Sequence, residues 1–169
     1  MKLLTHGSWL AAAVLVSACA WSPKHGIKDA VDGERDWVHV INANSGRCLD
    51  VRGGQTQEGI ELIQWGCHAD SNMEWRFEPV GDSTFRLRNR KSRKCVAPEA
   101  DSADEYVGLR QYECSDTESQ QWRLEPVDEK TYRLVNAASG RCAAVHESST
   151  DDWATIVQTE SCDAAARWY

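Results

Sequence analysis

Seven cysteines are the residues of this sequence whose type and spacing point most directly to chemistry. A thiol can attack a substrate, bind a metal or form a disulfide, and spacing separates these uses. No C-x-x-C or C-x-x-H pair occurs, which argues against a zinc site. Six of the seven form an even set, which is typical of a disulfide framework in an exported chain. They lie in two series with a step of 47 or 48 residues: Cys48, Cys95 and Cys142, then Cys67, Cys114 and Cys162.

Other patterns of catalytic residues do not occur in the sequence. The histidines at 25, 39, 68 and 146 show no metal-ligand spacing such as H-E-x-x-H. There is no G-x-S-x-G motif and no Gly-rich phosphate loop. We therefore expect no enzyme, no metal and no cofactor.

Length and charge set further bounds. The 169 residues suggest one domain with one core. The formal net charge of −7 argues against nucleic-acid binding, which depends on Lys and Arg neutralising phosphates. The eight tryptophans are a high number, and most of them are expected in the core.

Three internal repeats must position these residues. Four other residue types keep the step of the cysteines to within one residue: Asn at 42, 89 and 136, Ser at 45, 92 and 139, Gln at 64, 111 and 158, and Trp at 75, 122 and 168. Alternating runs at 85–88 and 132–135 predict strands, and the segments 44–46 and 138–140 predict turns. Three equal all-β units of this size predict closure into a β-trefoil, which hides the strand edges.

The motifs within each repeat resemble those of ricin B-type β-trefoil lectins. In that family a Q-x-W motif closes each repeat, and it stands intact at Gln120-Gln121-Trp122. The copies at 73–75 and 166–168 are degenerate. The resemblance covers residues 37–169, with repeats of about 37–83, 84–130 and 131–169, and it implies an all-β, disulfide-stapled β-trefoil. A more distant resemblance is to the ricin-like binding subunits of cytolethal distending toxins.

The repeats also favour one disulfide pairing. The two cysteines of each repeat are 19, 19 and 20 residues apart, and we expect the pairs Cys48–Cys67, Cys95–Cys114 and Cys142–Cys162. Loops of this length stabilise a fold by about 3 kcal/mol each. We expect the repeated Trp residues in the core and the repeated Gln residues on backbone groups.

A sugar site needs carboxylate or amide groups for the hydroxyls and an aromatic face for the apolar side of the ring. In ricin B-type lectins these are an Asp two residues after the first Cys, an aromatic residue two before the second Cys, and an Asn three before the motif Trp. Repeat one matches with Asp50, Trp65 and Asn72. The resemblance thus implies a galactose-like ligand at repeat one.

The other two repeats match this pattern less well. Repeat two keeps the aromatic residue, Tyr112, as a possible second site, but it has Ala97 and Ser119 at the other two positions. Repeat three places its aromatic position on Thr159 or Glu160, depending on where one extra residue falls, and has alanines at the other two positions: Ala144 and Ala165. Because alanine accepts no hydrogen bond from a hydroxyl, we expect no site at repeat three.

The N-terminal segment is expected to direct export. Residues 1–18 have the charge and apolar run of a secretory signal. The string Val16-Ser17-Ala18-Cys19 resembles the lipobox of bacterial lipoproteins, which implies cleavage before Cys19 and acyl chains on its sulfur. Residues 19–36 are expected to form a tether. In Gram-negative lipoproteins an Asp directly after the lipidated Cys favours retention in the inner membrane. Ala20 stands at this position, so the resemblance implies that the protein is located in the outer membrane of a bacterial envelope.

Six basic residues lie between Arg86 and Lys94 in this acidic chain. Such a run can bind phosphates or sulfated sugars, but it is more typical of a solvated face that balances nearby acids.

Two functions follow from the sequence as a whole. One is a lipid-anchored lectin that holds glycans at the cell envelope. The other is a protein-interaction module, or a toxin's cell-binding subunit, on the same trefoil without sugar binding.

Overall fold

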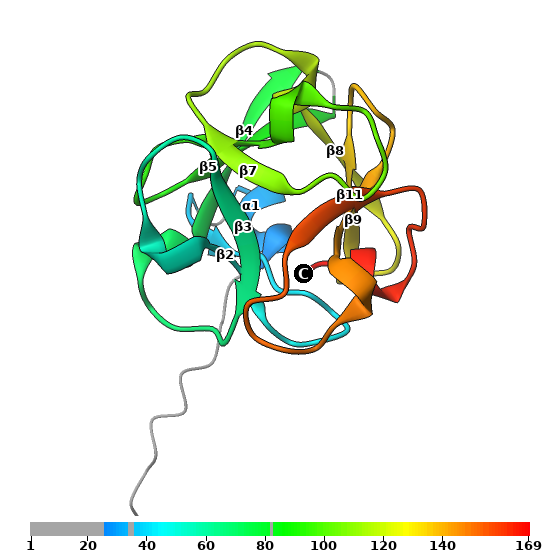
Figure 1. Cartoon of the computed structure of the whole chain (residues 1–169). Coiled ribbons are helices and arrows are strands. Elements are labelled where there is room, and N and C mark those ends of the chain that lie inside the picture. The colour runs from blue at the N-terminus through cyan, green and yellow to red at the C-terminus, as the bar shows by residue number, and fades with distance from the viewer. Residues whose placement is uncertain (1–25, 34–35, 82) are drawn as a thin grey trace, which may run out of the picture.

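The computed structural model describes residues 26–33, 36–81 and 83–169. The expected signal peptide and the expected lipid attachment at Cys19 lie outside these residues. Within them the chain forms an all-β barrel of three similar parts (Figure 1), and the predicted β-trefoil is confirmed.

Eleven strands and seven short helices make up the described part of the chain. The strands are β1 (Val38–His39), β2 (Cys48–Val51), β3 (Ile60–Trp65), β4 (Glu74–Gly81), β5 (Thr84–Asn89), β6 (Cys95–Pro98), β7 (Leu109–Tyr112), β8 (Trp122–Pro126), β9 (Tyr132–Asn136), β10 (Cys142–Val145) and β11 (Ile156–Thr159). The helices are α1 (Ile27–Val31) and six 3₁₀ turns: η1 (Arg52–Gly54), η2 (Ser71–Met73), η3 (Glu99–Asp101), η4 (Glu118–Gln120), η5 (His146–Ser148) and η6 (Ala164–Ala166).

Each repeat contributes one antiparallel hairpin that carries its first cysteine. In these hairpins β2 pairs with β3, β6 with β7 and β10 with β11. Pairing of β3 with β7 and of β4 with β5 joins repeat one to repeat two. Isolated bridges join repeat one to repeat three, at Ile63 with Thr155 and at Asn42 with Trp168, and so close the ring.

Three tryptophans fill the centre of the barrel. Trp75, Trp122 and Trp168 are at most 1% exposed, so their predicted place in the core is confirmed. Each indole nitrogen donates a hydrogen bond of 2.9–3.0 Å to a backbone carbonyl oxygen of its own repeat, and this satisfies the buried N–H group. The acceptors are the carbonyl oxygens of Leu49, Val96 and Ala143.

The predicted disulfides are confirmed. Each joins the start of the hairpin to the segment that follows it, in the pairs Cys48–Cys67, Cys95–Cys114 and Cys142–Cys162. Because each bridge lies within one repeat, every repeat is closed locally before it packs on its neighbours.

The repeated glutamines satisfy backbone groups, as predicted, but they do so on a neighbouring repeat. The Gln64 amide nitrogen donates to the backbone oxygens of Ser149 and Asp151, at 3.0 and 2.8 Å. Its amide oxygen accepts from the Ser45 hydroxyl at 2.7 Å. Two further glutamines repeat this arrangement: Gln111 on residues 55 and 57, and Gln158 on residues 102 and 104. Each glutamine therefore fixes the loop of the preceding repeat in cyclic order.

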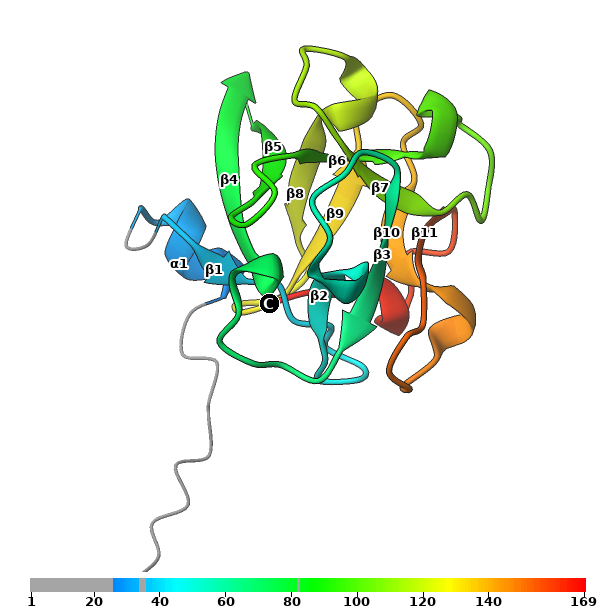
Figure 2. The same cartoon turned by 60° about the vertical axis from the view of Figure 1, so that its left-hand side comes forward.

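The packed part of the chain begins before residue 37. Ile27, in α1, is fully buried in the main core cluster, and α1 lies beside β1 and β4 (Figure 2). A Cβ on Gly26 would lie 2.7 Å from the backbone carbon of Tyr169, so this close approach requires glycine. The C-terminal part of the expected tether is therefore a short helix against the trefoil. None of the helices in the described ranges is long and apolar enough to cross a membrane.

Candidate functional site

The three residues predicted at repeat one line a single pocket. Asp50 lies on β2, Trp65 ends β3 and Asn72 lies in η2, and their side chains border a pocket of about 230 Å³. The hairpin places Asp50 and Trp65 on one face, because Cys48 pairs with Trp65 and Asp50 follows Cys48 by two positions. Asn72 joins them through its hydrogen bond to Asp50. The alternate residues of β2, Leu49 and Val51, point into the core.

Asp50 is a buried carboxylate at the base of this pocket. It is 5% exposed, and its Oδ1 accepts a 2.5 Å hydrogen bond from the Asn72 amide nitrogen. Burial raises the pKa of Asp50 from 3.8 to about 6, although the Asn72 hydrogen bond and the electrostatic interactions with His68 and Lys91 act in the opposite direction. At neutral pH Asp50 is therefore ionised and accepts hydrogen bonds from ligand hydroxyls.

Two pocket residues come from other repeats and were missed by the sequence analysis. Trp153, from repeat three, packs against Trp65 with ring centroids 4.6 Å apart and ring planes inclined by 68°. Lys91, from the turn after β5 in repeat two, also lines the pocket. Glycine at position 54 gives the lysine room, because a Cβ there would lie 2.8 Å from Lys91 Nζ. The pocket is thus built by all three repeats.

Repeat two has a smaller pocket of about 190 Å³ with a different carboxylate. Tyr112 lines it, and Ala97 is fully buried at the position of Asp50. Asp101 supplies a carboxylate from the turn after β6, where its Oδ1 accepts a 2.5 Å hydrogen bond from the Ser119 hydroxyl. Asp101 was missed because it stands at the position of Gly54, which is outside the family pattern. Repeat two therefore has an aromatic ring and a carboxylate after all.

Repeat three lacks both groups at the expected positions. The hairpin register pairs Cys142 with Thr159, as it pairs Cys48 with Trp65, so Thr159 rather than Glu160 takes the aromatic position. Ala144 and Ala165 are buried at the positions of the carboxylate and the amide. The pocket there, of about 150 Å³, is bordered instead by residues that include Tyr106 and His146.

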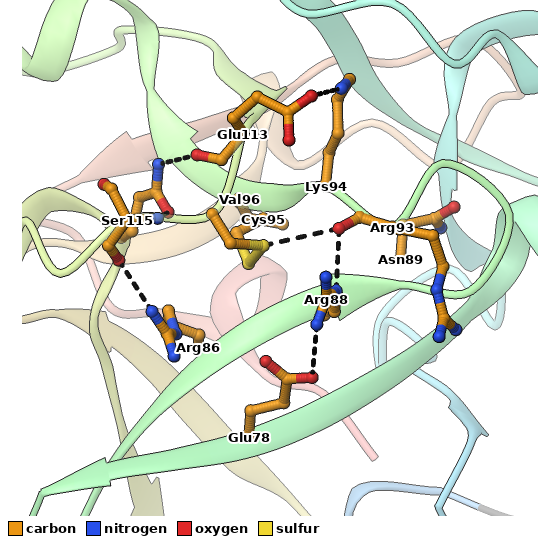
Figure 3. Close-up of a disulfide and its surroundings, with 12 residues drawn as sticks. Glu78, Arg86, Arg88, Asn89, Arg93, Lys94, Cys95, Val96, Glu113 and Ser115 are labelled. Atoms are coloured by element: carbon orange, nitrogen blue, oxygen red, sulfur yellow. Dashed lines mark hydrogen bonds and ion pairs between the residues drawn. A yellow bond between two sulfur atoms is a disulfide. The ribbon is translucent and has the colours of Figure 1, made fainter.

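The basic run is largely neutralised by neighbouring acids (Figure 3). Arg88 contacts Glu78 at 3.1 Å, and Lys94 forms an ion pair with Glu113. Two further pairs complete this pattern: Arg86 with Asp116 and Arg90 with Glu74. This arrangement fits a solvated face that balances nearby acids, and it leaves Lys91 as the member of the run that lines the repeat-one pocket.

Metal binding finds no support in the part of the chain that the structure describes. Residues 26–33, 36–81 and 83–169 contain no group of three or more His, Cys, Asp or Glu side chains arranged to hold a metal ion. The chemistry that the repeat-one pocket offers is that of recognition: a buried carboxylate, an amide, an ammonium group and two indole rings.

Comparison with known proteins agrees with this geometry. Residues 36–168 match the model of the ricin-type β-trefoil lectin domain. The chain is similar to the designed threefold-symmetric protein ThreeFoil, with 30% identity over 79% of this chain and 96% of that one and a TM-score of 0.77. It shares its fold with a chain of the Haemophilus ducreyi cytolethal distending toxin, at 19% identity over 79% and 81% of the two chains and a TM-score of 0.64.

A third likeness is to the C-half of the earthworm R-type lectin, whose structure contains GalNAc. The identity is 13% over 80% of this chain and 97% of that one, with a TM-score of 0.62. At this identity the likeness shows the fold alone. The family model, however, spans nearly the whole described trefoil, and the repeat-one pocket carries the three residues of the family pattern. This chain therefore belongs to the ricin-type β-trefoil lectin domain family.

Proposed function

We propose that the protein is a lectin that holds galactose-like glycans in the repeat-one pocket. The observation that carries the proposal is the convergence of Asp50, Trp65 and Asn72 on one pocket. A buried ionised carboxylate accepts hydrogen bonds from two adjacent hydroxyls, and the indole covers the C–H face of the sugar ring. Galactose suits this pair, because its axial 4-hydroxyl leaves one ring face as a continuous apolar surface.

Repeat two is proposed as a weaker second site. Its pocket contains Tyr112 and, through Asp101, a carboxylate held by Ser119. Asp101 is exposed rather than buried, so its hydrogen bonds to a sugar compete with water more than those of Asp50 do. One shallow site of this kind binds a monosaccharide near the millimolar range, or about −4 kcal/mol. Useful affinity then requires several sites acting together.

We further propose that a lipid on Cys19 supplies this multivalency by anchoring many copies at the outer membrane. The support is the lipobox-like sequence and Ala20 after the cysteine. Ile27, the first buried residue of the described chain, follows Cys19 by eight positions, which span at most about 28 Å when extended. An anchor at Cys19 would therefore hold the trefoil close to the membrane surface.

Membrane fractionation of cells that produce wild type and Cys19→Ala tests the anchor. We expect the wild type in the membrane fraction and the variant in the soluble fraction, because two or more acyl chains are needed for durable anchoring and the variant has none. Unchanged glycan binding by the purified variant is the control. A variant that stays in the membrane fraction would show that lipid on Cys19 is not the anchor.

A glycan array tests the lectin proposal. Wild type should bind arrayed galactosides, and Asp50→Ala should lose most of that signal while keeping its three disulfides. The alternative is a protein-interaction module, as in the binding subunit of a toxin, and the shared fold with the Haemophilus ducreyi toxin chain favours it as the second candidate. Silence of the wild type across the array, together with stoichiometric capture of one protein from host-cell extract, would support the alternative.

A further inference from the structure

Three loop residues occupy equivalent positions in the three repeats, and the two with aromatic side chains line the pocket of the next repeat. They are Gly59, Tyr106 and Trp153, spaced by 47 residues. The backbone N–H of each donates to the carbonyl oxygen of the glutamine that fixes its loop, at 2.8 Å for Gly59, 2.8 Å for Tyr106 and 3.1 Å for Trp153. Their φ angles are +73°, +60° and +70°. The backbone is therefore the same in all three repeats, and only the side chain differs.

Aromatic side chains are unexpected at this backbone conformation. A φ near +70° favours glycine and disfavours a bulky L residue, and repeat one does have glycine here. A Cβ added to Gly59 would meet nothing within 4 Å, so the loop itself does not need a side chain for packing. Tyr106 and Trp153 are nevertheless 60% and 50% exposed. Burial does not account for a strained backbone at side chains that are half exposed or more, so the strain indicates a function for these side chains.

Trp153 lies where it can extend the repeat-one pocket. Its ring meets the Trp65 ring at 68°, so the two form a corner rather than parallel walls. The Arg52 guanidinium lies 5.5 Å from the centre of the Trp153 ring and pairs with Glu61 at 2.6 Å, which helps to hold the ring in place. A flat sugar ring can lie against only one of two faces inclined this way. The second face is available to the next sugar residue of a glycan.

We propose that Trp153 is a specificity-determining residue that makes the repeat-one pocket a site for glycans of at least two sugar residues. The terminal residue contacts Asp50, Asn72 and Trp65, and the following residue stacks on Trp153. This inference rests on the proposed lectin function and adds the size of the ligand to it. Repeat three, which has alanine at the position of Asp50, would thus contribute to recognition at repeat one.

Calorimetric titrations with methyl β-galactoside and lactose test this proposal. All proteins carry Tyr112→Ala, which removes the aromatic ring of repeat two and leaves repeat one as the site that is measured. The variants are Trp153→Gly, which matches Gly59 and suits the backbone, and Trp153→Tyr, which matches Tyr106. Tyr106→Gly is the control, because it makes the same change at the same loop position over the repeat-three pocket.

We expect the background protein to prefer lactose over methyl β-galactoside by about tenfold, which is the size of one aromatic stacking contact. Trp153→Gly should remove most of this preference through the loss of lactose affinity, whereas Trp153→Tyr and Tyr106→Gly should keep it. An equal loss for both ligands in Trp153→Gly would overturn the inference, since Trp153 would then only support Trp65. Equal affinity of the background protein for both ligands would also overturn it while the lectin function stands. If the background protein binds neither ligand, the lectin proposal and the inference fall together.

Discussion

Replacing Asp50 with asparagine should stabilise the fold and abolish sugar binding at the same time. Burial raises the pKa of Asp50 from 3.8 to about 6, and a shift of this size corresponds to about 3 kcal/mol of unfavourable free energy in the ionised state. Asparagine has nearly the same shape, carries no charge and keeps an oxygen that can accept from Asn72. The free energy of unfolding at pH 7 should therefore rise by roughly 1–3 kcal/mol, and Tm by several degrees.

The pH dependence of this difference identifies its cause. Between about pH 4 and pH 6 the folded protein binds more protons at Asp50 than the unfolded chain does, so the stability of the wild type falls as pH rises through this window. The advantage of Asp50→Asn should be absent below pH 4 and complete above pH 6. Sugar binding by the wild type should run the other way and weaken about tenfold from pH 7 to pH 5, because the protonated carboxyl accepts poorly.

Urea unfolding at several pH values, with galactoside titrations alongside, measures both effects. Asp128 provides a matched control, because hydrogen bonds from Thr131 and from the backbone N–H of Lys130 lower the pKa of this exposed carboxyl. Asp128→Asn should lose stability at neutral pH and leave binding unchanged. If Asp50→Asn is less stable than wild type at pH 7, the buried charge is not the source of strain in this pocket and the assignment of Asp50 is wrong.

The pocket and the disulfides lead to four further predictions. Trp65→Ala should abolish galactoside binding with little change in Tm, since the ring is only partly buried, and titration with parallel thermal melts checks this. Asn72→Ala should weaken binding and move its pH midpoint above 6, because the lost hydrogen bond lowers the pKa of Asp50; the pH profile of affinity is the measurement. Tyr112→Ala should reduce binding much less than Trp65→Ala, and a larger effect would place the main site in repeat two. Non-reducing peptide mapping of the purified protein should return the three bridges within repeats, and any bridge between repeats would contradict the structure.

The sequence was sufficient to predict the fold because the repeat is visible in it. Equal spacing of cysteine, asparagine, glutamine and tryptophan reflects equal positions in three hairpins, so the trefoil, the disulfides and the buried tryptophans could be predicted together. The residues of repeat one converge as expected because Asp50 and Trp65 lie on one face of a single hairpin. Contacts within a repeat are therefore readable from its spacing.

Contacts between repeats were not readable in the same way. Trp153 reaches the repeat-one pocket through a loop fixed by Gln64, and neither residue's own repeat indicates this contact. Asp101 stands at the repeat position of Gly54 rather than at that of Asp50, so the family pattern did not indicate it. The residue at the aromatic position of repeat three could be identified as Thr159 rather than Glu160 only from the pairing of β10 with β11. Ile27 was assigned to the tether because a few apolar residues in a segment of mixed charge do not indicate a core position.

The glutamine contacts also bear on how this chain folds. Gln64 and the oxygen of Ser149 that it binds are 85 residues apart, so the contact that orients Trp153 joins the first repeat to the last. Each disulfide closes a loop within a single repeat, but the ring closes only when the third hairpin is in place. A high proportion of such distant contacts slows folding. Ligand affinity at repeat one would thus report that the whole ring has closed, and a fragment that ends before residue 149 would carry Asp50 and Trp65 in an incomplete pocket.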